Sequence, residues 1–312
     1  MIQVIVSLFL RAVVVLSGTA LATFTLLWHA PGDPAQAIAM ARHNAIVSTE
    51  VVDLVRAEAG LDGGFFPAFQ AWIAPLLIGD FGQSSVTGRD VWPEMVTAMS
   101  YTLPLALSAL FIGLLFSVPL ALIATQRPGG WLDRGAVALA SVGVAIPAFW
   151  LGLLLILLFA VQLDWLPAMG ARTSAHLILP ALTLGLGVAA SLTRILRSGI
   201  LEAREQPFLP ALLRRGVIQR DLERDHVAPH AAIPFVTVLG LELAFLLEGI
   251  VVVEVIFARP GLASFLVSAI GARDFPKVQA AVLVTAVVFV VVNLLIDLLY
   301  RALDPRIGGH DA

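Results

Sequence analysis

The sequence contains no cysteine and only one lysine, Lys277, among its 19 basic residues. The absence of cysteine excludes a disulfide framework, a thiolate metal site and a cysteine nucleophile in this chain. Charged residues make up only 13% of the sequence, whereas a soluble domain has about 25%. Because 59% of the residues are hydrophobic, the composition indicates an integral membrane protein.

Sequence motifs of common catalytic sites are also missing. The chain has no G-x-x-x-x-G-K-[ST] phosphate loop, no G-x-S-x-G elbow and no H-E-x-x-H pair. His226 and His230 have the spacing of a metal pair, but Pro229 interrupts a helix there and further ligands are needed. We predict that the chain is not an enzyme and holds no metal or other cofactor.

Six apolar segments are long enough to cross a bilayer as helices, which takes about 20 residues each. Their continuous hydrophobicity excludes the alternating pattern of a membrane barrel. They are Ala12–His29, Tyr101–Thr125, Gly135–Val161, Leu177–Arg194 with a possible extension past Arg197, Ala231–Phe257 and Val278–Tyr300. The prediction is an all-α membrane protein with six spans, some of them kinked by proline.

The arginines predict the orientation. With the N-terminus inside, the inner loops and the tail hold eleven basic residues, whereas the longer outer segments hold seven. Positive charge favours the cytoplasmic side, so both termini are predicted to be cytoplasmic. The predicted divisions are an N-terminal segment with the first span at 1–30, an extracytoplasmic segment at 31–96, a core of five helices at 97–301 with a loop at 195–232, and a tail at 302–312.

The extracytoplasmic segment opens with a turn signal at Pro31–Pro34. A helical pattern follows from Val47 to Ala59 and ends near Gly60. About 70 residues is close to the lower limit for an independent core. We therefore expect this segment to pack on the spans or on a partner.

Several polar residues lie within the predicted spans, where burial of an ionisable group is costly. Glu242, Glu248 and Glu254 recur every six residues, which displaces each by about 120° around a helix. They therefore cannot share one face. We expect Glu254 and Asp297 to reach water at the membrane surfaces. The predicted pathway-lining residues are Glu242, Glu248 and Asn293.

A polar island from Arg194 to Pro234 interrupts this apolar sequence. It combines seven arginines and five interleaved acids with an apolar seam at helical spacing. The seam consists of Leu209, Leu212, Leu213 and Val217. Such a segment is typical of a docking surface, although a basic amphipathic segment can also lie on anionic lipid.

Short strings along nearly the whole chain resemble the permeases of dipeptide, oligopeptide and nickel ABC importers. In order they are Gly60–Asp62, Gly79–Gly82, Thr87–Arg89, Leu103–Pro104, Ile146–Gly152, Trp165–Gly170, Leu179–Ala181, Ile233–Pro234, Val252–Glu254, Pro260–Gly261, Arg273–Pro276 and Leu303–Arg306. The Trp165–Gly170 string and the end at Asp304–Ile307 most resemble the nickel branch.

The resemblance implies a type I importer permease in the bacterial inner membrane. Such a chain forms half of a pore beside a second permease. Two cytoplasmic ATPases bind ATP and Mg, a binding protein outside delivers the solute, and no nucleic acid takes part. In these permeases a short cytoplasmic helix with the pattern E-A-A, three residues, then Gly couples the permease to the ATPase.

The corresponding coupling residues here are Pro210, Ala211, Leu212 and Gly216, with Arg214 and Arg215 as ion-pair partners for the ATPase. Pro210 replaces a charged residue and Leu212 replaces a small one. Because proline inside a helix costs about 3 kcal/mol but is accepted in the first turn, we expect the coupling helix to start near Pro207 or Pro210 and to stop at Gly216.

Two other classes of protein stay open at this stage. A proton-coupled secondary transporter would use Glu242, Glu248 or Asp297 as proton carriers and would work without ATP. A membrane-embedded enzyme is the other class, for which no nucleophile and base are recognisable. The solute also stays open between a dipeptide, a longer peptide, nickel and a metal chelate.

Overall fold

A computed structural model describes residues 2–29, 33–43, 47–58 and 62–303. The predicted turn at Pro31–Pro34, the helix end near Gly60 and the tail from Asp304 lie wholly or partly outside these residues. The described residues are mostly helical, and the only β pairing among them is an isolated bridge between Gln83 and Asp90. The prediction of an all-α protein is confirmed.

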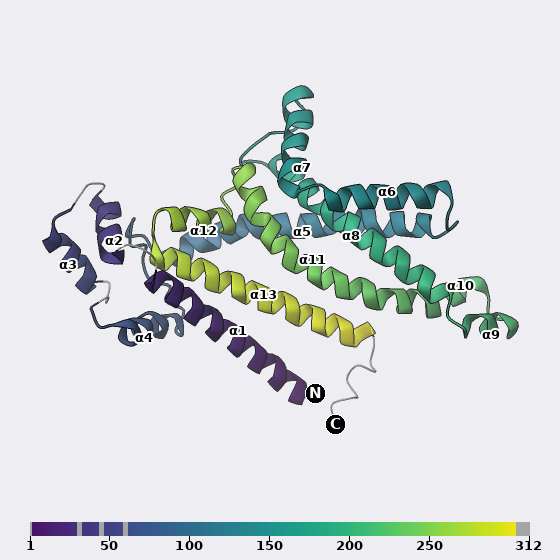
Figure 1. The fold of residues 1–312 in the computed structure, drawn as a ribbon, viewed down its shortest axis with the longest axis horizontal. Helices are drawn as coiled ribbons and strands as arrows, with labels where there is room; N and C mark the ends of the chain where they lie inside the picture. The colour runs from purple at the N-terminus through teal and green to yellow at the C-terminus, as the bar shows by residue number, and fades with distance from the viewer. Residues whose placement is uncertain (1, 30–32, 44–46, 59–61, 304–312) are drawn as a thin grey trace. The chain divides into compact units, whose positions relative to one another are not determined.

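The chain divides into two compact units. Unit 1 consists of Met1–Thr102 and Pro260–Val291, and unit 2 of Leu103–Arg259 and Val292–Ala312. The helices, labelled as in Figure 1, are α1 Ile2–Trp28, α2 Pro34–His43, α3 Thr49–Glu58, α4 Phe65–Leu76, α5 Val91–Ala124, α6 Trp131–Ala145, α7 Ala148–Leu155, η1 Ile156–Gln162, η2 Ser174–Leu177, α8 Ile178–Arg204, α9 Leu209–Arg214, α10 Gln219–Leu222, η3 Glu223–Val227, α11 Ala228–Ile256, α12 Leu262–Gly271 and α13 Phe275–Leu303.

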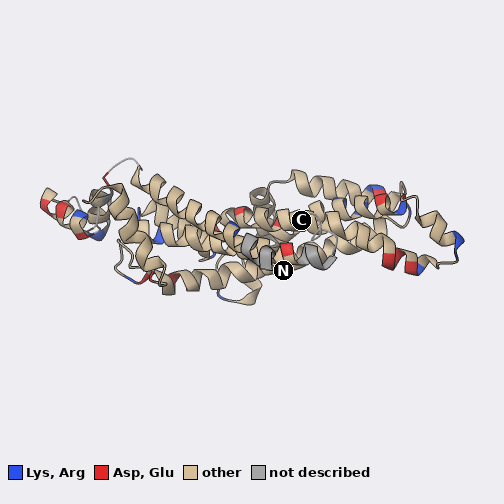
Figure 2. Cartoon of the chain, turned by 90° about the horizontal axis from the view of Figure 1, so that it is seen from below, with Lys and Arg blue, Asp and Glu red and all other residues tan. Residues whose placement is uncertain are grey.

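Five helices in the described residues are long and apolar enough to cross a membrane, and there are six spans if one bent pair counts as a span. The fourth span continues past Arg197 to Arg204, as the sequence allowed. The predicted third span is not a single rod, because α6 and the α7–η1 helix meet at an angle of 102°. Pro147 explains the break, since its ring forces Ile146 into an extended conformation. Figure 2 shows charged residues mostly at helix ends and turns.

Helix α8 forms the centre of unit 2. More than half of its apolar window is buried (56%), against 11–22% in the other single-helix spans. It packs against α6, α7 and α11, and its glycines permit close approach. A Cβ on Gly185 would lie 2.6 Å from the side chain of Ile112, and a Cβ on Gly143 of α6 would lie 2.7 Å from that of Ala190. Such small-residue contacts are typical of helix packing in membranes.

Unit 1 joins the segment between the first two spans to α1, α12 and α13. Phe24 of α1 stacks on Trp72 of α4 with ring centroids 5.5 Å apart. A second apolar cluster joins α2 and α3 through Ile38, Val52 and Val55, with Phe275 packed against it. The expectation that this segment packs on the spans is confirmed, because α4 contacts α1 through these rings and the cluster of α2 and α3 contacts Phe275 of α13.

A buried polar cluster holds the loop before α5 onto the start of α13. The carboxylate of Asp274, which is almost fully buried, accepts hydrogen bonds from the Ser84 hydroxyl (2.5 Å) and the Ser85 N–H (3.1 Å). The Lys277 ammonium lies 2.6 Å from Glu94 and 3.8 Å from Asp274. The single lysine of the chain is thus the cation that balances two carboxylates.

Candidate functional site

A short helix, α9, lies where the coupling helix is predicted. Pro210 lies in its first turn, where a missing N–H costs nothing, and Gly216 follows its end. Gly216 adopts a φ of 88°, and the N–H of Val217 donates to the carbonyl of Leu212 (3.2 Å). This is the hydrogen bond of a glycine-terminated helix end. Both predicted boundaries of the helix are confirmed.

One face of α9 packs on its own unit. Leu209 is buried in a cluster formed by α8, α10, η3 and α11, and Leu212 packs partly buried against the same cluster. The cluster residues are Ile200, Ala203, Leu209, Leu222, Val227 and Ala231. The short helix therefore has a fixed orientation, although six residues alone would not form a stable helix in water.

The opposite face of α9 is exposed. It presents Pro210, Ala211, Leu213, Arg214 and Arg215, and the Leu213 side chain is 47% exposed. Neither arginine forms an ion pair with another described residue. The sequence pattern assigns both Leu212 and Leu213 to the apolar seam. It cannot tell which of the two is buried, because their burial depends on the position of α8 and α11. Of the two, Leu213 is the apolar side chain available to a partner.

Arg204 connects three elements near α9. Its Nε and one terminal nitrogen donate to the two carboxylate oxygens of Glu223 at 2.9 and 3.2 Å. The other terminal nitrogen donates to the carbonyl oxygen of Thr125, just after α5, at 2.6 Å. The planar guanidinium makes these three bonds through three different nitrogens, a fork that the single nitrogen of an ammonium group lacks. Arg204 thus joins the end of α8 to the segment after α9 and to the end of α5.

A second arginine ties α8 to the start of α6. Arg197 forms a bidentate pair with Asp133, in which one terminal nitrogen lies 2.7 Å from Oδ2. Asp133 is almost fully buried and also accepts the N–H of Gly129 at 2.7 Å. Sequence reasoning grouped Arg197 and Arg204 with the docking arginines. The structure instead places both of them in contacts inside unit 2.

Figure 1 shows where these contacts lie in unit 2: α9 and α10 follow the end of α8, beside the turn that joins α5 to α6. Charged residues gather at this same end of unit 2 in Figure 2. The island is therefore a small folded assembly, in which some arginines fix the helices and others face outward.

The predicted pathway residues differ in exposure. Glu248 and Asn293 are exposed and Glu242 is partly exposed. The expectation that Glu254 reaches water is wrong, because its side chain has no exposed surface.

The two histidines of the island have contacts of their own. The Nδ1 of His230 lies 2.8 Å from the carbonyl oxygen of His226, and both rings lie near the ring of Phe208. Within the part of the chain that the structure describes, no group of three potential metal-ligating side chains is found.

With this arrangement established, comparison with known proteins assigns the family. The model of the family described as "Binding-protein-dependent transport system inner membrane component" matches residues 117–309. The chain belongs to this family. Its members are transport components of the inner membrane that work with a binding protein and an ATPase, so the chain is a permease subunit and not an enzyme.

Curated relatives of this permease extend the match over most of the chain. The glutathione transport system permease protein GsiC of Escherichia coli K12 is 38% identical over 277 residues, which are 89% of each chain. The protein of the same name in Salmonella typhi is 38% identical over 288 residues, or 92% of this chain and 93% of the relative.

Solved structures support the fold of the permease. The methionine ABC transporter MetNI, in an inward-facing conformation, superposes with a TM-score of 0.54 at 21% identity, over 67% of this chain and 96% of that chain. An amino acid ABC transporter with histidines gives a TM-score of 0.52 at 20% identity, over 67% and 94%. The importer-permease fold predicted from the sequence is confirmed.

Proposed function

We propose that this permease forms one half of a translocation pathway and is driven through α9. A second permease would supply the other half, two cytoplasmic ATPases would bind ATP and Mg, and a binding protein would deliver the solute. The permease itself would bind no cofactor. The observation that carries the proposal is α9, whose outward face is exposed while its inward face is fixed to α8 and α11.

In the proposed mechanism, the ATPase binds α9 through contacts with Leu213, Arg214 and Arg215. Closure of the ATPase pair displaces α9, and Arg204 carries this displacement to α5 and α8 because it bonds to both Glu223 and Thr125. Pro210 lies in the first turn of the helix and Gly216 ends it, while Ala211 lies on its exposed face. Only a contact that differs in strength between the inward-open and outward-open states can drive the exchange between them.

The orientation belongs to the proposal as well. We place the α9 end of unit 2 and both termini in the cytoplasm, 31–96 outside the membrane, 97–301 as the transport core and 302–312 as a tail. The excess of arginine in the inner loops supports this orientation. Glu242, Glu248 and Asn293 are proposed as pathway-lining residues, which requires that the second permease cover their exposed sides.

For the solute we favour a small peptide over nickel. The relatives named for glutathione support this choice, because glutathione is a tripeptide and the identity of 38% extends over 89% of the chain. The resemblance of Trp165–Gly170 to the nickel branch is the weaker support, since it covers six residues.

Reconstitution of the full complex in proteoliposomes tests the proposal. We expect ATP-dependent uptake of glutathione or of a dipeptide in the presence of the cognate binding protein, and no uptake when either ATP or that protein is omitted. Uptake of nickel alone would contradict the peptide assignment. Uptake by the permease alone, driven by a proton gradient without nucleotide, would replace the importer with the secondary transporter.

A further inference from the structure

Unit 1 contains a cavity of about 420 Å³ to which no function has been assigned above. Its wall is formed by the segment between the first two spans together with the end of α1 and the start of α13. A volume of this size lies within the range of small-molecule sites, about 300–1,000 Å³. The cavity is therefore large enough for a ligand of about the size of a dipeptide.

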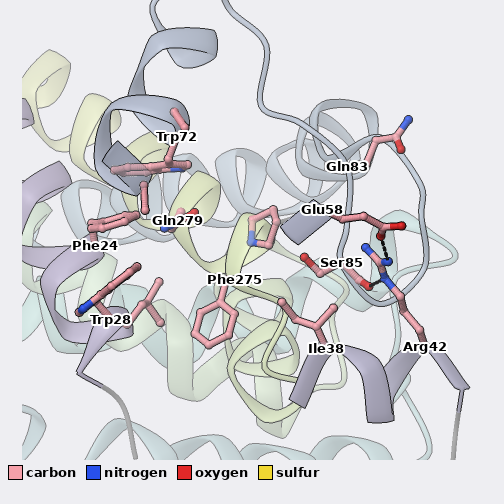
Figure 3. Close-up of a pocket in the computed structure, with 14 residues that line it drawn as sticks. Phe24, Trp28, Ile38, Arg42, Glu58, Trp72, Gln83, Ser85, Phe275 and Gln279 are labelled. Atoms are coloured by element: carbon pink, nitrogen blue, oxygen red, sulfur yellow. Dashed lines mark hydrogen bonds and ion pairs between the residues drawn. The ribbon is translucent and has the colours of Figure 1, made fainter. Parts of the chain in front are cut away.

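The two sides of the cavity differ in chemistry. Figure 3 shows the rings of Phe24, Trp28 and Trp72 on one side, and Arg42 with Glu58 on the other. The Arg42 guanidinium donates to Glu58 Oε2 at 2.9 Å and to the backbone carbonyl of Ser85 at 2.7 Å. One side therefore suits an apolar or aromatic group, and the other presents charges of both signs.

Gln279 of α13 gives the cavity a polar group among the aromatic rings. This residue lines the cavity and is only 7% exposed. No hydrogen bond joins its side-chain amide to another described residue. The fully buried side-chain atoms that lack a partner do not include this amide, so it borders the open space of the cavity and can pair with a group of a bound molecule.

We propose that this cavity binds a short peptide with an apolar or aromatic side chain. The side chain would lie against Phe24 and Trp72, the amide of Gln279 would pair with a peptide group, and the Arg42–Glu58 pair would face the charged ends of the peptide. A lipid acyl chain fits less well, because it would leave the Gln279 amide unpaired. This inference rests on the proposed peptide transport, and adds a peptide-binding site outside the transport core.

Equilibrium binding of tritiated Ala-Phe tests the site. The permease complex is reconstituted in nanodiscs without binding protein and without nucleotide, so that the peptide site of the binding protein is absent. We expect saturable binding that Gln279→Leu weakens about tenfold, which corresponds to the loss of a buried hydrogen bond. Gln70→Leu is the matched control, because Gln70 is exposed on α4 and does not line the cavity.

A second variant guards against misfolding of the first. Ala71 lines the cavity and is itself exposed, so Ala71→Leu narrows the opening without entering a packed core. We expect this variant to weaken Ala-Phe binding as well. Sodium decanoate, an acyl chain without a peptide group, should compete poorly. Strong competition by decanoate, together with unchanged Ala-Phe binding in both variants, would overturn the site.

Uptake measured in parallel separates this inference from the proposed function. Peptide uptake with no saturable Ala-Phe binding would refute the cavity site alone. Saturable binding that depends on Gln279, with no peptide uptake by the full complex, would refute the proposed function and leave the site standing.

Discussion

Replacing Gly216 by alanine should weaken the coupling of ATP hydrolysis to uptake through strain in the backbone. Gly216 has a φ of 88°, in the left-handed region, and a Cβ built on it would meet no atom within 4 Å. The available space therefore contributes nothing to the cost of the substitution. The cost comes from the clash of a Cβ with its own backbone, about 1–2 kcal/mol for a residue other than glycine.

A strain of this size is large for a short helix. Relief of the strain requires the chain to leave the left-handed conformation, which breaks the hydrogen bond from Val217 to Leu212 and frees the end of α9. An energy of about 1–2 kcal/mol changes the ratio of ordered to disordered helix by about 5- to 30-fold. Gly216→Asn should be milder, because asparagine tolerates the left-handed region better than alanine.

The assay is the number of solute molecules taken up per ATP hydrolysed in proteoliposomes. We expect the order wild type, Gly216→Asn, Gly216→Ala, Gly216→Val from best to worst coupling. Gly135→Ala is the control, because Gly135 lies in α6 and its Cβ would also meet no atom within 4 Å. Without a left-handed φ, alanine there should stabilise the helix by about 0.5–1 kcal/mol.

Equal coupling in Gly216→Val and the wild type would refute the role of α9. A loss of coupling of the same size in Gly135→Ala would also refute the reasoning, since it would show that any added methyl group at this end of the permease disturbs transport.

Three further predictions concern other contacts. Leu213→Asp should reduce uptake per ATP without lowering the thermal unfolding midpoint. Leu212→Asp should lower both, because it places a charge against a buried cluster. Equal unfolding midpoints in the two variants would contradict the assignment of Leu212 to the packed face of α9 and of Leu213 to the exposed face. Arg204→Lys keeps the charge but loses the guanidinium fork that reaches both Glu223 and the carbonyl of Thr125. It should lower the unfolding midpoint and uptake, because the unpaired carbonyl costs about 1 kcal/mol. Wild-type values of both quantities would refute the link between α8 and α5. Asp274→Asn should speed acylation of Lys277 by an amine-reactive ester, measured by peptide mapping, because the variant removes one of the carboxylates that hold the ammonium; an unchanged rate would contradict the cluster.

The boundaries of the coupling helix could be predicted because they depend on local chemistry. In a short helix proline is favoured in the first turn and glycine favours a left-handed end, so Pro210 and Gly216 mark α9 without any knowledge of its neighbours. The long spans could also be predicted from the sequence, since continuous hydrophobicity indicates them directly.

Features that depend on distant residues could not be predicted. Asp133 and Arg197 are 64 positions apart in sequence, and nothing near either residue indicates the other. The burial of Glu254 likewise depends on the helices that cover α11. Pro147 predicted a kink in the third span, but an angle of 102° depends on how α6 and α7 pack against α8.

The two arginine contacts of α8 also limit how this permease can be recombined with its relatives. The turn from Thr125 to Asp133 bonds to α8 through Arg197 and Arg204, so it cannot be exchanged as an independent module. A chimera that takes the turn from this permease and α8 from a parent without an arginine at position 197 would leave the buried carboxylate of Asp133 without its partner. Library designs should therefore place crossover points outside 125–204 and inherit that stretch as one block.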